Sequence, residues 1–385
     1  MAMPSAYGVT MSRVVFRTTV AALLVATTMV ACSDSDDGAK GSRTPTAGTP
    51  GASSPGSASA AASSSGSSGP VLPVGNGTLT PQVIARLGKT HLTDAEMAAG
   101  AKGTWKGTQI GTLTQGADVS LTVKDAQGWK IVGGWWPSKG LPGPYLGGKR
   151  HVVALGSDAR QGQDIQHSRA DTIQVIGLDG HGGGGILGVP RDSFVRLPSG
   201  RSGKINGAMS GGGPTAMAKT VSSTIGIPLQ GYLLTDFVGF ERAVYAIGGI
   251  PVTLKRPIKD VPAGTHNLTG PQALTVARER KSLPGGDFER SANQGLVLMS
   301  GYAKVRSQGP AKLPALMTAI SPHLSTNLDT AQVLTLLASA YQVNPSRLGR
   351  TVADGQSGPG PGGASIVRLT SRARADFAAF RDGNL

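Results

Sequence analysis

The sequence predicts an α/β protein: a three-layer αβα sandwich around a central mixed sheet, preceded by a small N-terminal β-rich region. From His151 onward, short apolar runs of strand length alternate with amphipathic helical patterns, which is typical of layered α/β domains. Residues 76–150 instead carry the patterns of short strands separated by turn residues. The first 75 residues have a different composition. About 310 residues therefore remain for the folded part, enough for a large α/β domain with an appendage.

The N-terminus has the layout of a secretory signal. Arg13 and Arg17 precede residues 18–31, which are apolar and uncharged but shorter than the ~20 residues that a membrane span needs. The run ends in Met29-Val30-Ala31-Cys32, which resembles the lipobox of bacterial lipoproteins, with Cys32 as the lipidated residue. An ordinary signal peptide or a short uncleaved anchor with a chance cysteine is the alternative. Residues 1–32 are therefore expected to export the chain, and to anchor it to the outer face of the cell membrane.

Residues 33–75 are mostly Ser, Gly, Ala, Thr and Pro. Such a segment cannot bury enough apolar surface to offset the entropy of ordering it, so a disordered tether is expected. The formal net charge of +15 favours anionic partners. Nucleic acid is not expected among them, because the chain is exported and has no convincing helix-turn-helix pattern. Cys32 is the sole cysteine, which excludes an intramolecular disulfide.

Residues 76–148 form the expected β-rich accessory region. Strands are predicted at residues 104–110, 117–123 and 129–136, separated by Gly-rich or Asp-containing turns. All four tryptophans lie in this region. Exposed tryptophans would suit stacking on sugars, but we favour the interpretation that they form the core of a small sheet packed on the next domain.

Residues 149–306 are expected to form the catalytic domain. The clearest helix is 236–247, where Phe237, Phe240 and Val244 share one face, Asp236 suits the start and two glycines follow the end. The other expected elements are strands at 152–155, 172–178, 185–189, 230–234 and 252–254, and helices at 215–225 after the Gly211–Pro214 turn, at 271–278 and from Asp287 onward. Residues 307–385 are expected to be a C-terminal helical extension, with helices at 313–321 and 328–341, a Gly/Pro loop at 355–363 and one last segment.

Several familiar catalytic motifs are absent from the sequence. No two of the six histidines have the spacing of a zinc-binding helix, and no Gly-x-Ser-x-Gly elbow occurs. Residues 211–220 superficially resemble a phosphate-binding P-loop, but Ala218 rather than glycine precedes Lys219. We interpret that run as a turn that opens a helix. The sequence therefore disfavours a zinc hydrolase.

Arginine and aspartate gather where the predicted strands begin or end. Arg160, Arg169 and Arg191 lie near three such ends, together with Asp158 and Asp171. Ligand sites of α/β sheets collect at strand ends. Arginine forks bind phosphate oxygens, and magnesium prefers carboxylate ligands while phosphates complete its shell. The sequence therefore predicts a site for pyrophosphate with Mg²⁺ as the cofactor.

Two further motifs add residues to this site. Arg278 and Arg280 are two positions apart and do not share a helix face, so the helix is expected to end there if both reach one site. Asp287, Arg290 and Gln294 are spaced by three and four, which puts them on one helical face. For any single arginine a plain surface charge is the commoner role. The prediction therefore depends on the co-occurrence of these residues.

Six charged segments recur in this order: LGSDAR (155–160), SRADTI (168–173), VPRDS (189–193), KIN (204–206), RER (278–280) and GDFERSANQ (286–294). In order and spacing they resemble the motif series of the LytR–CpsA–Psr family, over about residues 149–305. The resemblance implies an extracytoplasmic, membrane-associated transferase. Such an enzyme moves a glycopolymer from a polyprenyl-pyrophosphate carrier to peptidoglycan with formation of a phosphodiester bond. It also implies magnesium, the three-layer αβα fold and an apolar channel for the lipid.

The resemblance also implies roles for individual residues. Asp158 and Asp171 match the metal-associated aspartates, and Arg191 is expected to act with them in catalysis. The residues expected to bind the pyrophosphate are Arg169, Arg191, Lys204, Arg278, Arg280, Asp287, Arg290 and Gln294. This chain has Asn293-Gln294 where the family usually has paired glutamines, and a lipobox where the family usually has a membrane helix.

In the expected reaction, a muramyl hydroxyl attacks the sugar-bearing phosphorus while arginines and magnesium stabilise the departing polyprenyl phosphate. Asp171 or Asp158 is expected to take the proton of the hydroxyl. Two apolar helix faces are expected either to line the lipid channel or to form plain core: Phe237, Phe240 and Val244, and Leu296, Val297 and Met299.

Two other functions stay open at this point. The same site would suit a phosphohydrolase that releases phosphate from polyprenyl pyrophosphate with water as the acceptor. A lipoprotein without catalytic activity that binds wall polymer or polyprenyl lipid is the second alternative. The sequence leaves the identity of the polymer and the length of the polyprenyl chain undetermined.

Overall fold

The computed structural model describes residues 79–160 and 162–385. The expected signal peptide at residues 1–32, with Cys32, and the expected tether at residues 33–75 lie outside the described residues and stay predictions. Within the described ranges, no helix combines the length and the apolar character that crossing a bilayer requires. All described residues belong to a single unit by their contacts.

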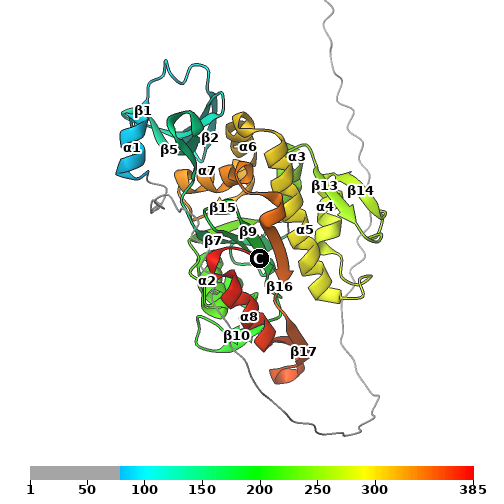
Figure 1. Cartoon of the computed structure of the whole chain (residues 1–385). Helices are drawn as coiled ribbons and strands as arrows, with labels where there is room; N and C mark the ends of the chain where they lie inside the picture. Colours follow the sequence, from blue (N-terminus) through cyan, green and yellow to red (C-terminus); the bar gives the residue numbers. More distant parts are fainter. Residues whose placement is uncertain (1–78, 161) are drawn as a thin grey trace, which may run out of the picture. The chain divides into compact units, whose positions relative to one another are not determined.

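The centre of the structure is a six-stranded sheet with the strand order β15-β12-β7-β8-β9-β16 (Figure 1). β12 runs parallel to β7 and β16 runs parallel to β9, whereas the other neighbouring pairs are antiparallel. The predicted mixed sheet is therefore confirmed. Its strands are β7 (Arg150–Ser157), β8 (Ala170–Leu178), β9 (Gly184–Gly188), β12 (Gly231–Thr235), β15 (Ser325–Thr326) and β16 (Leu348–Val352).

Helices cover both faces of this sheet, which confirms the three layers (Figure 1). Side chains alternate along β7: Val153 and Leu155 join the core under α2, whereas Val152 joins the core formed with α7 on the other face. One face carries α2 (Gly207–Ile225) and α8 (Ser371–Ala379). The other side carries α3 (Phe237–Ala246), α4 (Gly270–Arg278), α5 (Gly286–Ser307), α6 (Leu313–Ile320) and α7 (Thr330–Ala338).

Local capping chemistry sets several helix ends. The side chain of Asp236 caps α3 by accepting a hydrogen bond from the backbone N–H of Gly239 at 2.7 Å. Thr269 and Gln272 form a capping box at the start of α4. α4 ends at Arg278, and Glu279 is already extended, with φ −63° and ψ 134°. The expectation that this helix ends within the Arg-Glu-Arg motif is confirmed.

The helix predicted at 215–225 begins earlier than expected. α2 starts at Gly207 and is interrupted by a kink, where Gly212 and Gly213 leave the helical conformation. Gly213 has a φ of +71°, which glycine adopts without strain, and Pro214 follows it. The predicted turn at 211–214 therefore exists as a kink between two helical segments. The sequence signal was correct for the second segment and missed the first, because Ala208 and Met209 alone show little periodicity.

The N-terminal region forms a second six-stranded sheet, in which β6 extends the order β1-β5-β4-β3-β2. The single strand predicted at 104–110 is wrong, because a turn at Lys106 and Gly107, with φ of 47° and 85°, divides it into β2 and β3. The strands predicted at 117–123 and 129–136 are confirmed within a few residues. The elements are α1 (Pro81–Leu87), β1 (His91–Leu92), β2 (Ala101–Trp105), β3 (Thr108–Gln115), β4 (Asp118–Asp125), β5 (Gly128–Trp136) and β6 (Leu141–Tyr145).

The tryptophans of this region are core residues, as favoured from the sequence. None of the four is more than 7% exposed, so stacking on sugars is excluded for them in this conformation. Trp105 packs in one hydrophobic cluster with Met317 of α6, and the backbone N–H of Thr104 donates to Thr318 Oγ1 at 2.7 Å. The N-terminal sheet therefore shares a core with the helices of the central domain.

The expectation that residues 307–385 form a helical extension is wrong in part. This segment supplies β15 and β16 to the central sheet, so the α/β domain extends beyond residue 306. The predicted loop at 355–363 contains a strand that pairs with a later one. These short, Gly-rich strands lack the alternation that identifies strands in a sequence. The remaining strands are β10 (Phe194–Arg196), β11 (Ser202–Lys204), β13 (Ile250–Leu254), β14 (Gly264–Leu268), β17 (Gly355–Pro359) and β18 (Ser365–Leu369).

The C-terminal segment closes the α2 face of the sheet. Phe380 is fully buried, and a Cβ placed on Gly177 of β8 would lie 2.6 Å from its ring. We predict that Phe380→Ala lowers the free energy of unfolding by about 3–5 kcal/mol, because it leaves a cavity against the sheet. Urea unfolding would measure this, with Arg381→Ala at the neighbouring exposed position as the control. Equal stability of the two variants would contradict this account of the C-terminus.

Candidate functional site

The polar edge of the sheet begins where β7 ends and β8 starts. Ser157 pairs with Ala170 after a register shift, so Asp158 and Asp171 flank the last pair of this ladder. Asp158 continues the pairing of the two strands through two hydrogen bonds to the backbone of Arg169. Its N–H donates to the Arg169 carbonyl at 3.0 Å, and its Oδ1 accepts from the Arg169 N–H at 2.9 Å.

An ion-pair network connects this edge to α5. Arg191, in the loop after β9, donates to Asp171 Oδ2 at 2.7 Å, and its Nε lies 3.5 Å from Asp287 Oδ1. The same Asp287 oxygen lies 2.7 Å from a guanidinium nitrogen of Arg290. Asp287 therefore lies between two arginines. We call Asp171, Arg191, Asp287 and Arg290 the charge network.

Asp192 is a member of this site that sequence reasoning missed. Its carboxylate pairs with Lys204 at 2.9 Å and lies 3.9 Å from Arg191 Nε. Lys204 sits on β11, directly opposite Phe194 on β10. The signal was present in the sequence, since Asp192 follows Arg191 in the same charged segment. The structure thus brings Lys204 to the charge network through an acid that the motifs did not single out.

The pKa values of Arg290 and Arg191 are shifted by the charged groups around them. Burial lowers the pKa of the Arg290 guanidinium, Asp287 and Asp171 raise it, and the nearby Arg191 and Arg280 lower it. Burial also lowers the pKa of Arg191, but Asp171, Asp287 and Asp192 raise it, and the result lies above its ordinary value. Arg280 is therefore near enough to act on the charge network, although it forms no ion pair with any other described residue.

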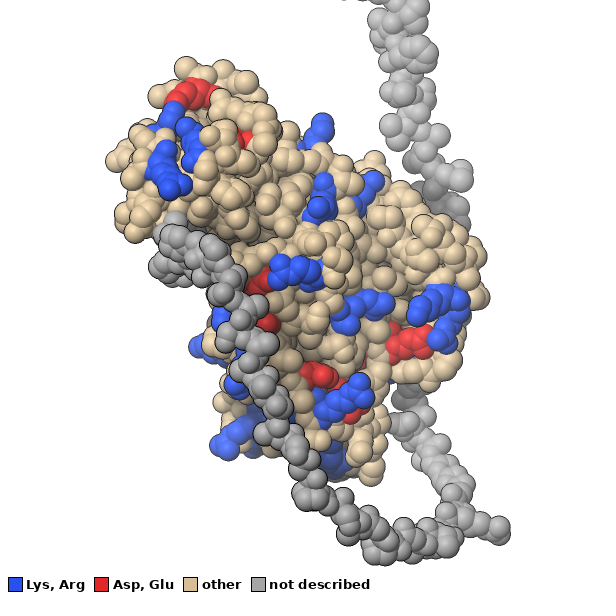
Figure 2. All heavy atoms as spheres, viewed as in Figure 1, with Lys and Arg blue, Asp and Glu red and all other residues tan. Residues whose placement is uncertain are grey.

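The charges of the site do not balance once the unpaired arginines are counted. Arg191, Arg290 and Lys204 pair with three aspartates. Among the ion pairs of the described residues, none includes the expected pyrophosphate ligands Arg169, Arg278 and Arg280. All three of these arginines are exposed. On the face shown in Figure 2, acidic side chains lie beside basic ones, and the basic ones are in excess. The site therefore has cationic capacity left for an anion.

Glu279 explains why its two neighbouring arginines face outward. Its side chain is buried, accepts from the Ser282 N–H at 2.9 Å and pairs with Lys259 at 3.0 Å. The Ser282 hydrogen bond, followed by Lys259, lowers the pKa of Glu279 to about 2. Arg278 is exposed, and its guanidinium carbon lies 4.1 Å from the ring centroid of Phe237 on α3.

Gln294 is buried at the junction of α4, α5 and the sheet. Its side-chain NH₂ donates to the carbonyl of Ala277 at 3.2 Å, and its oxygen lies 3.5 Å from the amide nitrogen of Gln174 on β8. Gln174 also donates to the carbonyl of Ser291 at 3.0 Å. In this conformation Gln294 therefore positions the end of α4 next to the sheet edge.

The carboxylates at the edge fit a magnesium ion that phosphate oxygens help to bind. Asp171 Oδ1 is buried and has no hydrogen-bond partner, so a carboxylate oxygen is left unsatisfied at the site. In the described part of the chain, no three His, Cys, Asp or Glu side chains converge as a self-contained metal site. Magnesium commonly binds through one or two carboxylates plus substrate phosphates. The pair Asp158 and Asp171 matches that requirement.

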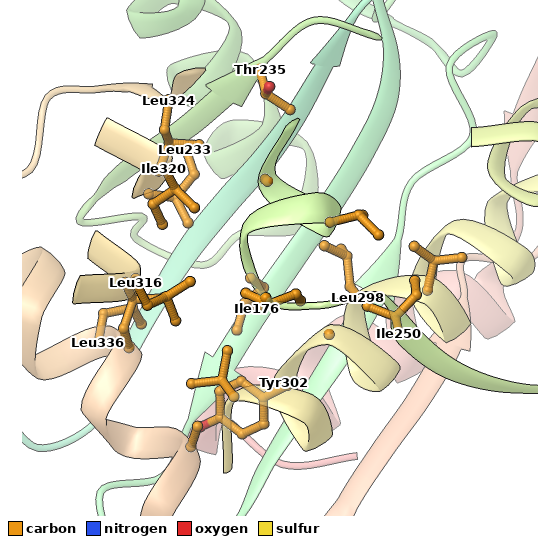
Figure 3. Close-up of a pocket in the computed structure, with 18 of the residues that line it drawn as sticks. Ile176, Leu233, Thr235, Ile250, Leu298, Tyr302, Leu316, Ile320, Leu324 and Leu336 are labelled. Atoms are coloured by element: carbon orange, nitrogen blue, oxygen red, sulfur yellow. The ribbon is translucent and has the colours of Figure 1, made fainter. Parts of the chain in front are cut away.

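An apolar cavity begins beside the polar edge. A first chamber of about 170 Å³ is lined by Arg278 and Gln294 as well as by apolar side chains. A second chamber of about 260 Å³ continues between the sheet, α3, α5 and α6, and its lining is almost entirely apolar (Figure 3). The two chambers share the residues Ile176, Leu233, Thr235, Phe240, Val297, Leu298 and Leu324. We call the two chambers together the apolar channel.

The helix faces expected from the sequence line this channel in part. Phe237 lines the first chamber, Val244 the second, and Phe240 and Val297 line both. Leu296 and Met299 line neither chamber, whereas Leu298 lines both. The inward stripe of α5 is therefore offset from the predicted one, because Leu298 follows Gln294 and Ser291 around the helix.

Comparison with known proteins agrees with this fold. The model of the LytR_cpsA_psr family matches residues 146–364. The polyisoprenyl-teichoic acid–peptidoglycan teichoic acid transferase TagU of Bacillus mycoides is 31% identical over 191 residues, 47% of this chain and 61% of TagU. The regulatory protein MsrR of Staphylococcus aureus is 30% identical over 190 residues, 47% of this chain and 57% of MsrR. The matches thus span about three fifths of the length of these relatives.

Solved structures share the fold. The crystal structure of B. subtilis TagV is 25% identical with a TM-score of 0.53, covering 61% of this chain and 98% of TagV. A structure of TagT bound to LI-WTA has a TM-score of 0.52 at 24% identity, covering 61% of this chain and 91% of TagT. The N-terminal sheet, β1 to β6, precedes the residues that the family model matches.

Asp287 is the shared acid of the charge network, so its removal has a specific consequence. We predict that Asp287→Asn lowers the free energy of unfolding by about 1–3 kcal/mol, since two guanidiniums then face each other without an intervening carboxylate. Inorganic pyrophosphate should raise the unfolding temperature of the variant more than that of the wild type. Differential scanning fluorimetry would measure both effects, with Asp260→Asn at an exposed position as the control. An unchanged unfolding temperature would show that Asp287 does not screen the arginines.

Proposed function

Because the chain belongs to the LytR_cpsA_psr family, we propose that it transfers a glycopolymer from a polyprenyl-pyrophosphate carrier to peptidoglycan and forms a phosphodiester bond. The observation that carries this proposal is that Arg278, which forms no ion pair among the described residues, lines the first chamber of an apolar channel. A polyprenyl pyrophosphate has the matching arrangement, with a doubly charged head next to a long hydrocarbon chain. The name of TagU describes such a transfer of teichoic acid.

The pyrophosphate head would bind at the polar edge of the sheet. Arg278 and Arg280 project from the end of α4, and Arg169 lies at the end of the loop between β7 and β8. Their forks suit phosphate oxygens. The charge network would hold Arg191 and Arg290 beneath this head. Lys204, Asp287 and Gln294 position these groups through the contacts described above.

Catalysis would come from positioning and charge neutralisation. A phosphoryl transfer needs little covalent chemistry from the protein, because the departing polyprenyl phosphate is stabilised mainly by cations. Asp158 and Asp171 would hold Mg²⁺, which supplies charge neutralisation on the phosphate oxygens when bound. Arg191 would stabilise the developing charge at the transferred phosphate. Asp158 or Asp171 would take the proton from the acceptor hydroxyl.

The proposed reaction implies a location outside the cytoplasm. Peptidoglycan and polyprenyl-linked polymers meet at the outer face of the membrane, where the expected signal at residues 1–32 would deliver the chain. Cys32 would be the lipidated anchor and residues 33–75 the tether. These parts of the proposal depend on the sequence alone.

A transfer assay would test the function. The full-length protein would be incubated with a polyprenyl-pyrophosphate oligosaccharide, a peptidoglycan acceptor and Mg²⁺. We predict that Arg191→Ala lowers the transfer rate by about 10²–10³-fold, since it removes a cation that acts on the developing charge. Arg242→Ala, at an exposed position of α3 that lines neither chamber, should retain the rate.

Omitting the peptidoglycan acceptor from the assay distinguishes the transferase from the phosphohydrolase and from the non-catalytic lipoprotein. Release of phosphate without an acceptor, at the same rate as with one, would favour the phosphohydrolase. Binding of the lipid without any product in either case would favour the non-catalytic lipoprotein. An Arg191→Ala variant with the wild-type transfer rate would overturn the assignment of the site.

The apolar channel generates a second prediction. Leu298→Trp should fill the space shared by both chambers and weaken the binding of a long-chain polyprenyl pyrophosphate by about tenfold or more. Binding of inorganic pyrophosphate should stay unchanged, because the arginines are not altered. Calorimetry with both ligands would measure this, with Tyr245→Trp on the exposed side of α3 as the control. Equal losses for both ligands would indicate a misfolded site, and no loss would place the lipid elsewhere.

A further inference from the structure

A second basic cavity, of about 350 Å³, lies between β10, the C-terminal end of α2, β18 and α8. Three arginines from separate elements line it: Arg196 on β10, Arg368 on β18 and Arg374 on α8. Phe194 and the buried Phe377 give it a partly apolar wall.

No acidic residue lines the second basic cavity. Among the ion pairs formed by the described residues, none includes Arg196, Arg368 or Arg374. Arg368 donates one hydrogen bond to the carbonyl of Pro359, at 3.0 Å. The basic cavity beside α4 differs in this respect, because acidic side chains line it as well. Three like charges therefore share the second cavity without a compensating carboxylate.

The partial negative charge at the C-terminal end of α2 could by itself stabilise the cluster of three arginines. That charge is too small to do so. Ser223 and Thr224 lie in its last turn and line the cavity. A helix C-terminus carries about half a negative charge, which neutralises only a fraction of three guanidiniums. An oxyanion from outside the chain would remove the remaining repulsion. Guanidinium forks bind phosphate oxygens in pairs, which favours phosphate over a diffuse counterion.

Backbone contacts connect this cavity to the charge network. The N–H of Val367 on β18 donates to the carbonyl of Asp192 at 2.9 Å, and Ser193 forms a β-bridge with Val367. Arg368 is thus one residue from a strand contact with the loop that carries Arg191. Arg368 and Arg374 lie beyond residues 146–364, so the family match does not account for two of the three arginines of this cavity.

We infer that the second basic cavity binds a phosphodiester unit of an anionic, phosphate-linked wall polymer. The exposed arginines suit an extended chain that crosses the surface, and the half-buried Phe194 suits the carbon face of its sugar or polyol units. The site would hold the polymer while its pyrophosphate end occupies the charge network. The role of this polymer as the transferred substrate rests on the proposed function, whereas binding to the cavity does not.

Binding of a labelled glycerol-phosphate oligomer to the full-length protein, measured by fluorescence anisotropy, tests the inference. Arg196→Gln/Arg374→Gln should weaken binding by about tenfold or more, since two charge-assisted contacts are lost. The control is Arg372→Gln/Arg381→Gln, which removes the same charge from exposed positions that do not line the cavity. Its affinity should change by less than about twofold. Equal losses in the two variants would overturn the site, because only net charge would then matter.

Other probes separate the possible sources of phosphate. Vesicles of phosphatidylglycerol should bind the two variants equally. If the vesicles instead lost affinity with Arg196→Gln/Arg374→Gln and the oligomer did not, a membrane surface would replace the polymer as the ligand. A neutral dextran should not compete with the oligomer, and competition by it would overturn phosphate recognition.

The test does not depend on transfer activity. Arg191→Ala should bind the oligomer with nearly wild-type affinity even though it fails in transfer. Loss of oligomer binding by this variant would show that the oligomer binds at the charge network and would overturn the inference. Transfer without specific oligomer binding would leave the proposed function intact and remove the second site alone.

Discussion

The carboxylate of Asp287 between Arg191 and Arg290 is the interaction on which the site depends. It joins the first turn of α5 to the loop after β9, two segments about a hundred residues apart in sequence. A negative charge in the first turn of a helix is itself favoured by the helix dipole. With Asp171 on the other side of Arg191, the carboxylates let two guanidiniums lie close together in a half-buried place. Without these carboxylates, the positive charges of the two guanidiniums would repel each other.

The central sheet borders two different environments, a polar site at its edge and an apolar channel on one of its faces. Side chains alternate between the two faces along each strand, which keeps the channel face apolar. At the edge, charged side chains from strand ends and loops create a polar site. Toward α5, even-numbered residues of β8 such as Ile176 face the apolar channel, and Gln174 on the same face connects to α5. The boundary between the two lies at Arg278 and Gln294, which contact both. A ligand with a charged head and a hydrocarbon chain is the molecule that satisfies both environments at once.

Residues that the sequence analysis did not assign to the site complete this arrangement. Glu279 turns inward and pairs with Lys259, so the arginines on either side of it are left facing solvent. Phe237 holds the guanidinium of Arg278 over its ring. The backbone of Asp192 is bonded to β18, which brings the C-terminal segment next to the site. Segments outside the family match thereby adjoin the polar edge of the sheet and add a basic surface of their own.

The fold class, the burial of the tryptophans and the set of charged residues at the strand ends could all be predicted from the sequence. These features follow from local periodicity, capping and spacing, which neighbouring residues encode. Three features could not be predicted and came from the folded structure. Asp192 joins Lys204 to the site, Leu298 rather than Met299 faces the channel, and residues 325–326 and 348–352 complete the sheet. Those outcomes depend on contacts between distant segments and on the rotation of a helix about its axis. Short strands rich in glycine also lack the alternation of apolar and polar residues by which a strand is recognised in a sequence.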